Sequence, residues 1–234
     1  MIAMLQLDKL DVGYQSSRII SGISFDVQAR DSLIILGRNG VGKSTLLKGL
    51  IGLLKPTAGT IKLEGRKVQG LAPHAVARSG IAYVPQGRRI IPKLTVLENL
   101  MVGTTARPGS SEIPPQVFTY FPILKERLSQ KGGTLSGGQQ QQLAIARAMC
   151  AQPKVILLDE PSEGIQPNVV QQIGEILVQI IAETGTSVVL VEQNLNLAFR
   201  VGGDCAVIEK GRISYRGKID EFHDQYLKKK FLAV

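Results

Sequence analysis

Tryptophan is absent from the 234-residue sequence, and only two cysteines and two histidines are present. Cys150 and Cys205 lie far apart and in no metal-ligand spacing, which argues against a disulfide- or zinc-stapled fold and favours buried thiols in a reducing compartment. No run approaches the roughly 18 uninterrupted apolar residues of a membrane helix. Aromatic residues make up only 5% of the chain, and no basic stripe alternates with them, so we expect no nucleic-acid partner.

The sequence does contain ample apolar material for a core. Hydrophobic residues account for 44% of the chain, which argues against disorder, and the length suits one large domain over residues 1–234. The formal charge of +9 fits phosphate ligands or a membrane surface. Its densest cluster, at residues 228–230, is expected to be a solvated end, although contact with anionic lipid headgroups would suit the charge equally well.

Short apolar runs of the strand type alternate with helical patterns, which predicts an α/β fold with parallel central strands. The segment 88–152 is mostly helical in pattern, and we predict an inserted helical subdomain there, within a core of about residues 1–87 and 153–234. The predicted strands are 5–12, 19–27, 33–36, 61–63, 81–84, 155–158, 188–191, 205–209 and 212–215. The predicted helices are 43–54, 95–102, 116–129, 139–150 and 168–184, with a loop over 104–116.

A glycine-rich segment between the predicted strand 33–36 and the helix that follows matches the P-loop pattern G-x-x-x-x-G-K-[ST]. Glycines let successive backbone N–H groups curl around a phosphate, and the positive end of the following helix adds to the effect. Lys43 supplies a cation for the outer phosphates, and Ser44 can hold Mg²⁺ through its hydroxyl. The predicted nucleotide-binding residues of this segment are Gly37, Arg38, Asn39, Gly40, Val41, Gly42, Lys43, Ser44 and Thr45.

Two carboxylates, Asp159 and Glu160, end the apolar strand 155–158. A strand end aimed at the phosphates would let Asp159 hold Mg²⁺, often through water. Glu160 would then polarise the attacking water as general base. Many buried strands simply stop at solvated acids, and this is the alternative interpretation. Because a P-loop precedes the strand, we predict a metal role for Asp159 and a catalytic role for Glu160, beside Lys43.

A second glycine cluster precedes the predicted helix 139–150. Ser136 can cap that helix, and Gly137 and Gly138 expose backbone N–H groups like those of an anion cradle. An ordinary capped helix would explain the serine but not two consecutive glycines. The string formed by Leu135, Ser136, Gly137, Gly138 and Gln139 resembles the signature of the ABC ATPases.

This resemblance covers essentially the whole chain, and it implies a P-loop NTPase core with an N-terminal antiparallel β subdomain and the inserted helical subdomain. In that family two ATPase subunits face each other head to tail, and each ATP lies between the P-loop of one subunit and the signature of the other. The resemblance therefore implies ATP and Mg²⁺ as cofactors. It also implies that residues 135–139 serve the partner's ATP.

Further positions match the family residue by residue. Tyr14 matches the aromatic residue that stacks on adenine, although a lone tyrosine is more often a core residue. Gln86 matches the glutamine that contacts Mg²⁺ and the water. Residues 161–167, the crossing loop, match the loop that reaches the opposite subunit. Gln193 stands where the family's switch histidine is usual, and we predict that it contacts the γ-phosphate without carrying a positive charge.

Other details resemble the importer branch for branched-chain amino acids and urea. Val-Glu-Gln-Asn at 191–194 and Glu-Pro-Ser-Glu-Gly-Ile-Gln-Pro at 160–167 are similar to that branch. Four consecutive glutamines at 139–142, and the segments 83–88 and 121–126, look most like the urea-importer ATPases. The resemblance therefore favours uptake of urea or short amides, with branched-chain amino acids as the alternative.

The resemblance implies an ATP-hydrolysing transporter subunit on the cytoplasmic face of the cell membrane, bound peripherally to membrane-spanning permease subunits. A second, similar ATPase and, indirectly, an external substrate-binding protein are the other expected partners. Two competing hypotheses are a soluble ABC ATPase outside transport and a nucleotide-binding subunit with little hydrolysis. The length disfavours the first, and Lys43, Asp159 and Glu160 together disfavour the second.

Overall fold

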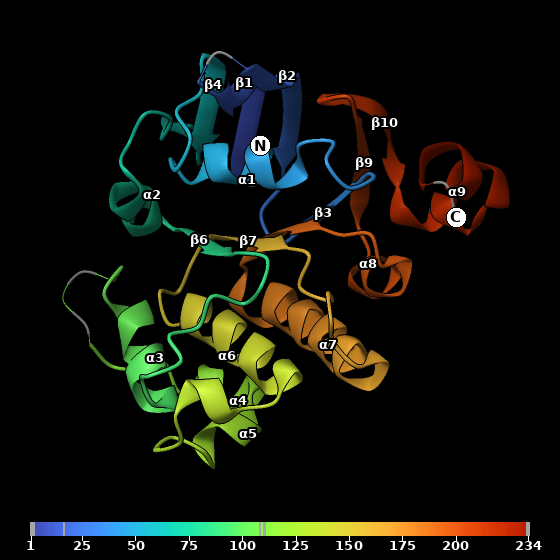
Figure 1. Cartoon of the computed structure of the whole chain (residues 1–234). Coiled ribbons are helices and arrows are strands. Elements are labelled where there is room, and N and C mark those ends of the chain that lie inside the picture. The colour runs from blue at the N-terminus through green and yellow to red at the C-terminus, as the bar shows by residue number, and fades with distance from the viewer. Residues whose placement is uncertain (1–2, 16, 108, 110, 233–234) are drawn as a thin grey trace.

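The computed structural model describes residues 3–15, 17–107, 109 and 111–232. In this part of the chain the strands form two sheets, and helix α1 (Lys43–Leu50) lies between them (Figure 1). The strands are β1 (Leu5–Tyr14), β2 (Ser17–Val27), β3 (Ser32–Leu36), β4 (Ala58–Leu63), β5 (Arg66–Lys67), β6 (Ile81–Val84), β7 (Val155–Asp159), β8 (Ser187–Val191), β9 (Asp204–Glu209) and β10 (Arg212–Lys218). The other helices are α2 (Pro73–Ser79), α3 (Val96–Thr104), α4 (Gln116–Tyr120), α5 (Pro122–Lys125), α6 (Gly137–Met149), α7 (Pro167–Thr184), α8 (Leu195–Val201) and α9 (Gln225–Leu232), with 3-10 turns η1 (Gly132–Thr134) and η2 (Ile219–His223).

The larger sheet has the strand order β10-β9-β3-β8-β7-β6. Its neighbours run parallel from β9 to β6, and β10 is antiparallel to β9 at one edge. Every residue of β3, β7 and β8 is buried, as expected for parallel strands that are covered on both faces. The predicted α/β fold with parallel central strands is confirmed.

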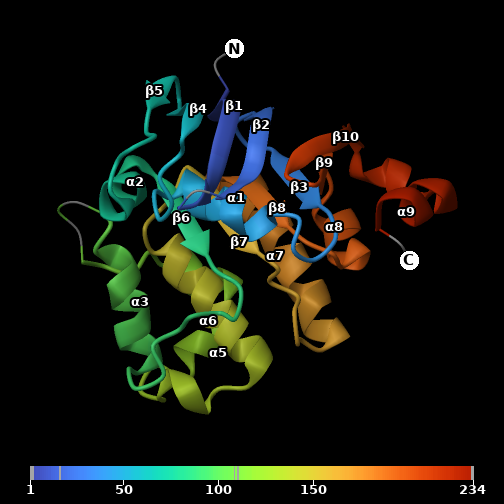
Figure 2. The same ribbon diagram turned by 45° about the horizontal axis from the view of Figure 1, so that its top comes forward.

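The smaller sheet has the order β2-β1-β4-β5 and is antiparallel throughout. It lies on the far side of α1 from the larger sheet (Figure 1), and the tilted view shows β1, β2, β4 and β5 side by side (Figure 2). The expected N-terminal antiparallel sheet is therefore present.

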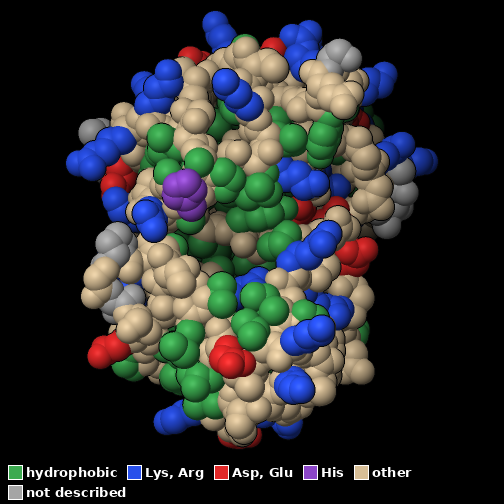
Figure 3. Space-filling view, turned by 60° about the vertical axis from the view of Figure 1, so that its left-hand side comes forward, with side chains coloured by type: hydrophobic (Ala, Val, Ile, Leu, Met, Phe, Trp, Pro, Cys, Tyr) green, Lys and Arg blue, Asp and Glu red, His purple; other side chains and the backbone are tan. Residues whose placement is uncertain are grey.

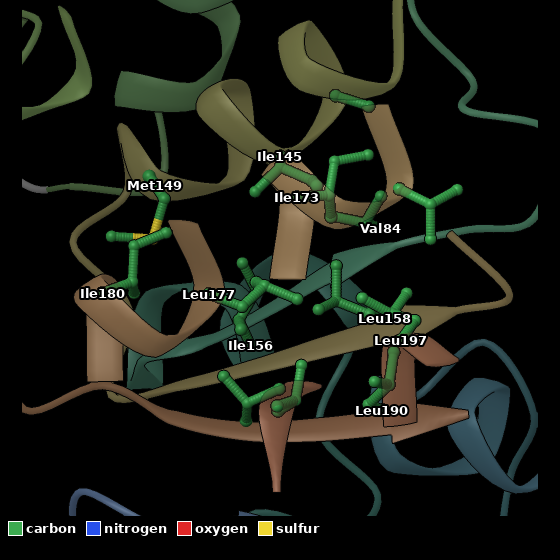
Figure 4. Close-up of a cluster of buried hydrophobic side chains, with 14 of the residues drawn as sticks. Val84, Ile145, Met149, Ile156, Leu158, Ile173, Leu177, Ile180, Leu190 and Leu197 are labelled. Atoms are coloured by element: carbon green, nitrogen blue, oxygen red, sulfur yellow. The ribbon is translucent and has the colours of Figure 1, made fainter. Parts of the chain in front are cut away.

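The side chains of the central strands alternate between two cores. Leu33 and Ile35 belong to the core shared with α1 and the smaller sheet, whereas Ile34 and Leu36 face the core on the opposite side. That second core lies between the larger sheet and helices α6 and α7, where strand and helix side chains interdigitate (Figure 4). The cluster drawn there includes Val84, Ile145, Met149, Ile156, Leu158, Ile173, Leu177, Ile180, Leu190 and Leu197.

The region between β6 and β7 is built from α3, α4, α5, η1 and α6. Thr95 caps α3 through a capping box with Glu98, as the sequence predicts. The predicted continuous helix 116–129 is wrong, because the chain breaks at Phe121 and leaves two short helices. A residue before proline is disfavoured in the α conformation, and Phe121 precedes Pro122 with φ −128° and ψ 64°. The predicted loop 104–116 has no strand in its described part, and residues 108 and 110 lie outside the described residues.

Helices α2, α8 and α9 are absent from the sequence prediction, and each is short, at seven or eight residues. Such segments carry too few turns to show clear helical periodicity. The predicted helix 43–54 ends earlier, at Leu50, and Gly52 has a positive φ of 76°. Residues 228–230 lie on α9, whose lysines border solvent, and Lys228 Nζ stands 5.8 Å from the centre of the Phe199 ring. None of the described helices has the length and apolar character needed to span a membrane.

Candidate nucleotide site

The P-loop joins β3 to α1, and three of its glycines hold backbone conformations that other residues rarely adopt. Gly37, Gly40 and Gly42 have φ of 149°, 80° and 107°. A Cβ on Gly37 would stand 2.6 Å from the carbonyl oxygen of Ile208, so this position also lacks room for a side chain. Because Gly42 occupies the N-cap of α1, no side chain caps this helix, and its first N–H groups remain available to an anion.

Lys43 is almost fully buried, with 4% of the side chain exposed. Its ammonium donates to the carbonyl oxygens of Gly37 and Arg38, at 2.8 and 3.1 Å, and pairs with Glu160 Oε1 at 3.1 Å. A buried cation needs such partners to offset its lost hydration. The ammonium is therefore held over the P-loop backbone, where a phosphate would compete with Glu160 for it.

Asp159 is the last residue of β7 and is 2% exposed. Its Oδ1 accepts a hydrogen bond from the Ser44 hydroxyl at 2.9 Å, and its Oδ2 accepts one from the Tyr83 hydroxyl at 2.9 Å. Burial raises the pKa of Asp159 above its ordinary value, and the two hydrogen bonds oppose that shift. Tyr83, whose own pKa is raised by burial, is a site residue that the sequence analysis missed. It becomes visible only once β6 is known to pair with β7.

Glu160 follows at a positive φ of 47°, which turns its side chain toward the P-loop. Besides pairing with Lys43, it accepts hydrogen bonds from Gln193 at 2.8 Å and from Gln86 at 3.3 Å. Gln193 also donates to Asn39 Oδ1 at 2.6 Å. The side chains predicted as general base, phosphate sensor and water contact thus form one polar network at the carboxyl ends of β6, β7 and β8.

A cavity of about 280 Å³ opens above these groups. Tyr14 lies at its edge, 44% exposed, as an adenine-stacking residue would need to be. Ile19, which the sequence analysis missed, adds apolar surface near it. The lining residues are Tyr14, Ile19, Asn39, Gly40, Gly42, Lys43, Ser44, Thr45, Gln86 and Glu160. Of the other predicted residues, Gly37, Arg38, Val41, Asp159 and Gln193 do not line it. Asp159 accepts a hydrogen bond from the lining residue Ser44, and Gln193 donates one to the lining residue Asn39.

The donor set suits a magnesium ion that arrives with a nucleotide. Mg²⁺ prefers oxygen ligands and is usually bound by one or two carboxylates together with substrate phosphates and water. Asp159 offers a carboxylate beside the Ser44 hydroxyl, and Gln86 offers an amide oxygen in the same cavity. Within the described residues no cluster of three or more histidine, cysteine or acidic side chains could hold an ion by itself. These residues therefore fit a metal that depends on the nucleotide.

The signature segment lies outside this cavity. Ser136 caps α6 and forms a capping box with Gln139. A Cβ on Gly138 would come within 2.8 Å of Val169, and one on Gly137 within 3.1 Å of the Arg88 guanidinium, so both glycines permit close packing. Leu135 is 5% exposed and packs in the core.

The comparisons with known proteins decide the family. A model described as ABC transporter matches residues 20–163, more than half of the chain. The chain belongs to the ABC transporter family. Together with the relatives described next, this match makes the protein an ATP-binding and ATP-hydrolysing transporter subunit.

Three curated relatives are branched-chain amino acid transport ATP-binding proteins by name. BraG of Pseudomonas aeruginosa is 43% identical over 212 residues, which cover 90% of this ABC ATPase and 91% of BraG. LivF of Archaeoglobus fulgidus, named as probable, is 32% identical and covers 96% of this chain and 97% of its own. BraF, from the same Pseudomonas strain as BraG, is 27% identical over 94% of each chain.

Two solved structures share the fold over nearly the whole chain. An ATP-binding cassette of an ABC transporter in its ADP conformation superposes with a TM-score of 0.86 at 26% identity, and it covers 100% of this chain and 98% of its own. A dimeric post-hydrolysis cassette bound to ADP and phosphate gives 0.82 at 26% identity, over 92% and 99%.

Proposed function

We propose that this ABC ATPase drives the uptake of branched-chain amino acids. The observation that carries the proposal is the 43% identity to BraG across nine-tenths of both chains. This replaces the urea preference of the sequence analysis, which depended on a few short segments such as the glutamines at 139–142. Identity spread over the whole chain is the stronger guide, and urea becomes one outcome of the test below.

We assign the chemistry to the network at the strand ends. The P-loop N–H groups and Lys43 bind the phosphates, and Tyr14 stacks on adenine. Ser44, Asp159 and Gln86 would hold Mg²⁺, which would neutralise phosphate charge. Once a phosphate takes over Lys43, Glu160 is released to accept the proton of the attacking water. Gln193 donates to the γ-phosphate from the position where it now donates to Glu160 and Asn39.

We propose that the working unit contains a second, similar ATPase subunit. The signature glycines and Ser136 stand outside the cavity of their own chain, which supports a role at a neighbour's ATP. The dimeric state of the solved cassette with ADP and phosphate supports the pairing of two ATPase subunits. Because BraF and BraG are two such proteins of one organism, we propose a heterodimer.

The permease would bind at the hollow seen in Figure 3, which lies between α2 and α3. A cavity of about 260 Å³ there has a mostly apolar lining, which includes Ile51, Val102 and Ala144. Tyr83 lines it too, and its hydroxyl hydrogen-bonds Asp159. A permease segment in this hollow would therefore contact Tyr83, and Tyr83 in turn contacts the proposed metal ligand Asp159. We therefore propose that the protein binds peripherally at the cytoplasmic face of the membrane, with residues 88–152 as its helical subdomain.

The test is reconstitution of the complete transporter in proteoliposomes, with its binding protein, permease and ATPases. We expect leucine, isoleucine or valine to stimulate ATP hydrolysis and to be taken up, and urea to do neither. Stimulation by urea alone would overturn the amino-acid assignment. Co-purification of the transporter from native membrane tests the heterodimer. Recovery of this chain as the sole ATPase beside the permease would overturn it.

A further inference from the structure

Glu192 is a buried carboxylate outside the lining of the nucleotide cavity. It follows β8 directly and is 1% exposed. Its Oε1 accepts the backbone N–H of Ser162 at 3.0 Å, and its Oε2 accepts those of Gln193 and Asn194 at 2.9 and 3.0 Å. Both oxygens are thus occupied by backbone donors from two separate loops.

Such a group is costly to bury. An ionised carboxylate loses its hydration, and the loss is offset only when its oxygens are fully hydrogen-bonded. Burial raises the pKa of Glu192, and the hydrogen bonds from Asn194, Ser162 and Gln193 oppose that shift. An apolar side chain at this position would avoid the cost but would leave three backbone N–H groups without these acceptors.

The two loops that Glu192 joins carry the groups proposed for hydrolysis. Ser162 lies in the crossing loop, two residues after Glu160, and Gln193 is the proposed phosphate sensor. The backbone N–H of Glu160 donates to Val191 at 2.9 Å, and that of Glu192 donates to Ile35 at 3.1 Å. The chain that carries Glu160 is therefore attached to the end of β8 at two points. Glu160 is held through its own N–H, and Ser162 is held through the Glu192 side chain.

From this geometry we infer that Glu192 is a positioning residue for ATP hydrolysis: it clamps the crossing loop to the loop of Gln193 and so sets Gln193 against Glu160. The inference rests on the roles proposed above for Glu160 and Gln193. The hydrogen bonds described for Glu192 join Ser162, Gln193, Asn194 and Ile35, and none of these residues belongs to the P-loop. The effect of Glu192 should therefore fall on the chemical step and leave nucleotide binding unaffected.

The isosteric change Glu192→Gln tests the clamp. A glutamine has one acceptor oxygen, so it can serve one loop but turns an NH₂ group toward the donors of the other. We expect kcat of the full-length protein to fall about 10-fold, because small misplacements of reacting groups cost this much or more. The dissociation constant for a non-hydrolysable ATP analogue should stay within about twofold of wild type, since the P-loop contacts are intact.

A matched control separates positioning from stability. Asn99 on α3 is likewise fully buried and clamps a loop through hydrogen bonds with Ile91, Leu94 and Thr95, none of which involves Glu160 or Gln193. Asn99→Asp is the reverse isosteric exchange. We expect both variants to lower the melting temperature and only Glu192→Gln to lower kcat. Equal losses of kcat in the two variants would overturn the inference.

A double-mutant cycle with Gln193→Ala identifies the route. If Glu192 acts through Gln193, adding Glu192→Gln to Gln193→Ala should change kcat by less than about twofold. Full additivity would overturn the inference and leave the role of Gln193 intact. A wild-type kcat for Gln193→Ala alone would overturn both. Should Glu192→Gln not fold, Glu192→Asp keeps the charge but shortens the reach between the loops, and an unchanged kcat in that variant would refute the clamp.

Discussion

The nucleotide cavity and the signature segment are held in shape by different kinds of contact. In the cavity, Ser44 meets Asp159 across 115 positions of sequence, and Gln193 meets Asn39 across 154. In the signature, Ser136 and Gln139 cap their own helix across three positions. The cavity therefore depends on correct sheet assembly, whereas the signature is a local unit that keeps its shape wherever α6 is placed. A local, rigid unit suits a group that is presented to another subunit.

The largest effect is expected from Glu160→Gln, which removes the charge from the centre of the long-range network. We expect kcat to fall about 100-fold or more, as for loss of a general base, while ATP still binds. Steady-state ATPase assays with a parallel binding titration measure this. Glu175→Gln, an exposed change on α7, serves as the control and should leave both values unchanged. An active Glu160→Gln protein would remove the general-base assignment.

The next largest effect is expected at one of two helix caps, and comparison of the two caps separates a loss of stability from a loss of ATPase activity. Ser136→Ala and Thr95→Ala each delete the cap of a capping box. Each should cost about 1 kcal/mol of unfolding free energy. Only Ser136→Ala should also lower ATPase activity, by about 10-fold, because its hydroxyl would face the partner's ATP. Equal activity in the two variants would reduce the signature serine to a structural cap.

Tyr14→Ala tests the exposed edge of the cavity. Stacking of a base on an aromatic ring is worth about 1–3 kcal/mol, so the dissociation constant for ATP should rise by about fivefold or more. Tyr226→Ala, on the more exposed tyrosine of α9, is the control and should bind ATP normally. Calorimetry on both variants gives the answer. Unchanged affinity in Tyr14→Ala would place the adenine elsewhere.

The smallest effect is expected in the rate at which the two buried cysteines are alkylated. Cys150 ends the signature helix, and Cys205 lies in β9, which pairs with the P-loop strand β3. Burial raises their thiol pKa to about 12 and about 11, so alkylation at pH 8 should require local opening. We expect ATP to slow labelling of Cys205 a few-fold more than that of Cys150. Mass spectrometry at partial labelling measures the ratio, and equal protection would indicate that the two regions open together.

The features that could be predicted from the sequence are those whose residues are close together along the chain. The P-loop, the capping boxes, and the carboxylates at the end of an apolar strand all have local signals. Tyr83 and Glu192 have none, because their roles depend on which strand ends lie side by side. The order β8-β7-β6 is a property of the assembled sheet. The break at Phe121 did have a local signal, Pro122, which a helical pattern on both sides concealed.

The position of β3 in the larger sheet has a consequence for biosynthesis. This strand ends at Leu36, but both of its neighbours, β8 and β9, come from residues 187–209. A nascent chain therefore displays its glycine-rich loop long before the strands that support it are translated. Such distant pairing is slow and leaves an apolar strand uncovered in the meantime. We expect the ribosome-bound chain to gain nucleotide affinity only in the final stage of synthesis, after β9 has emerged.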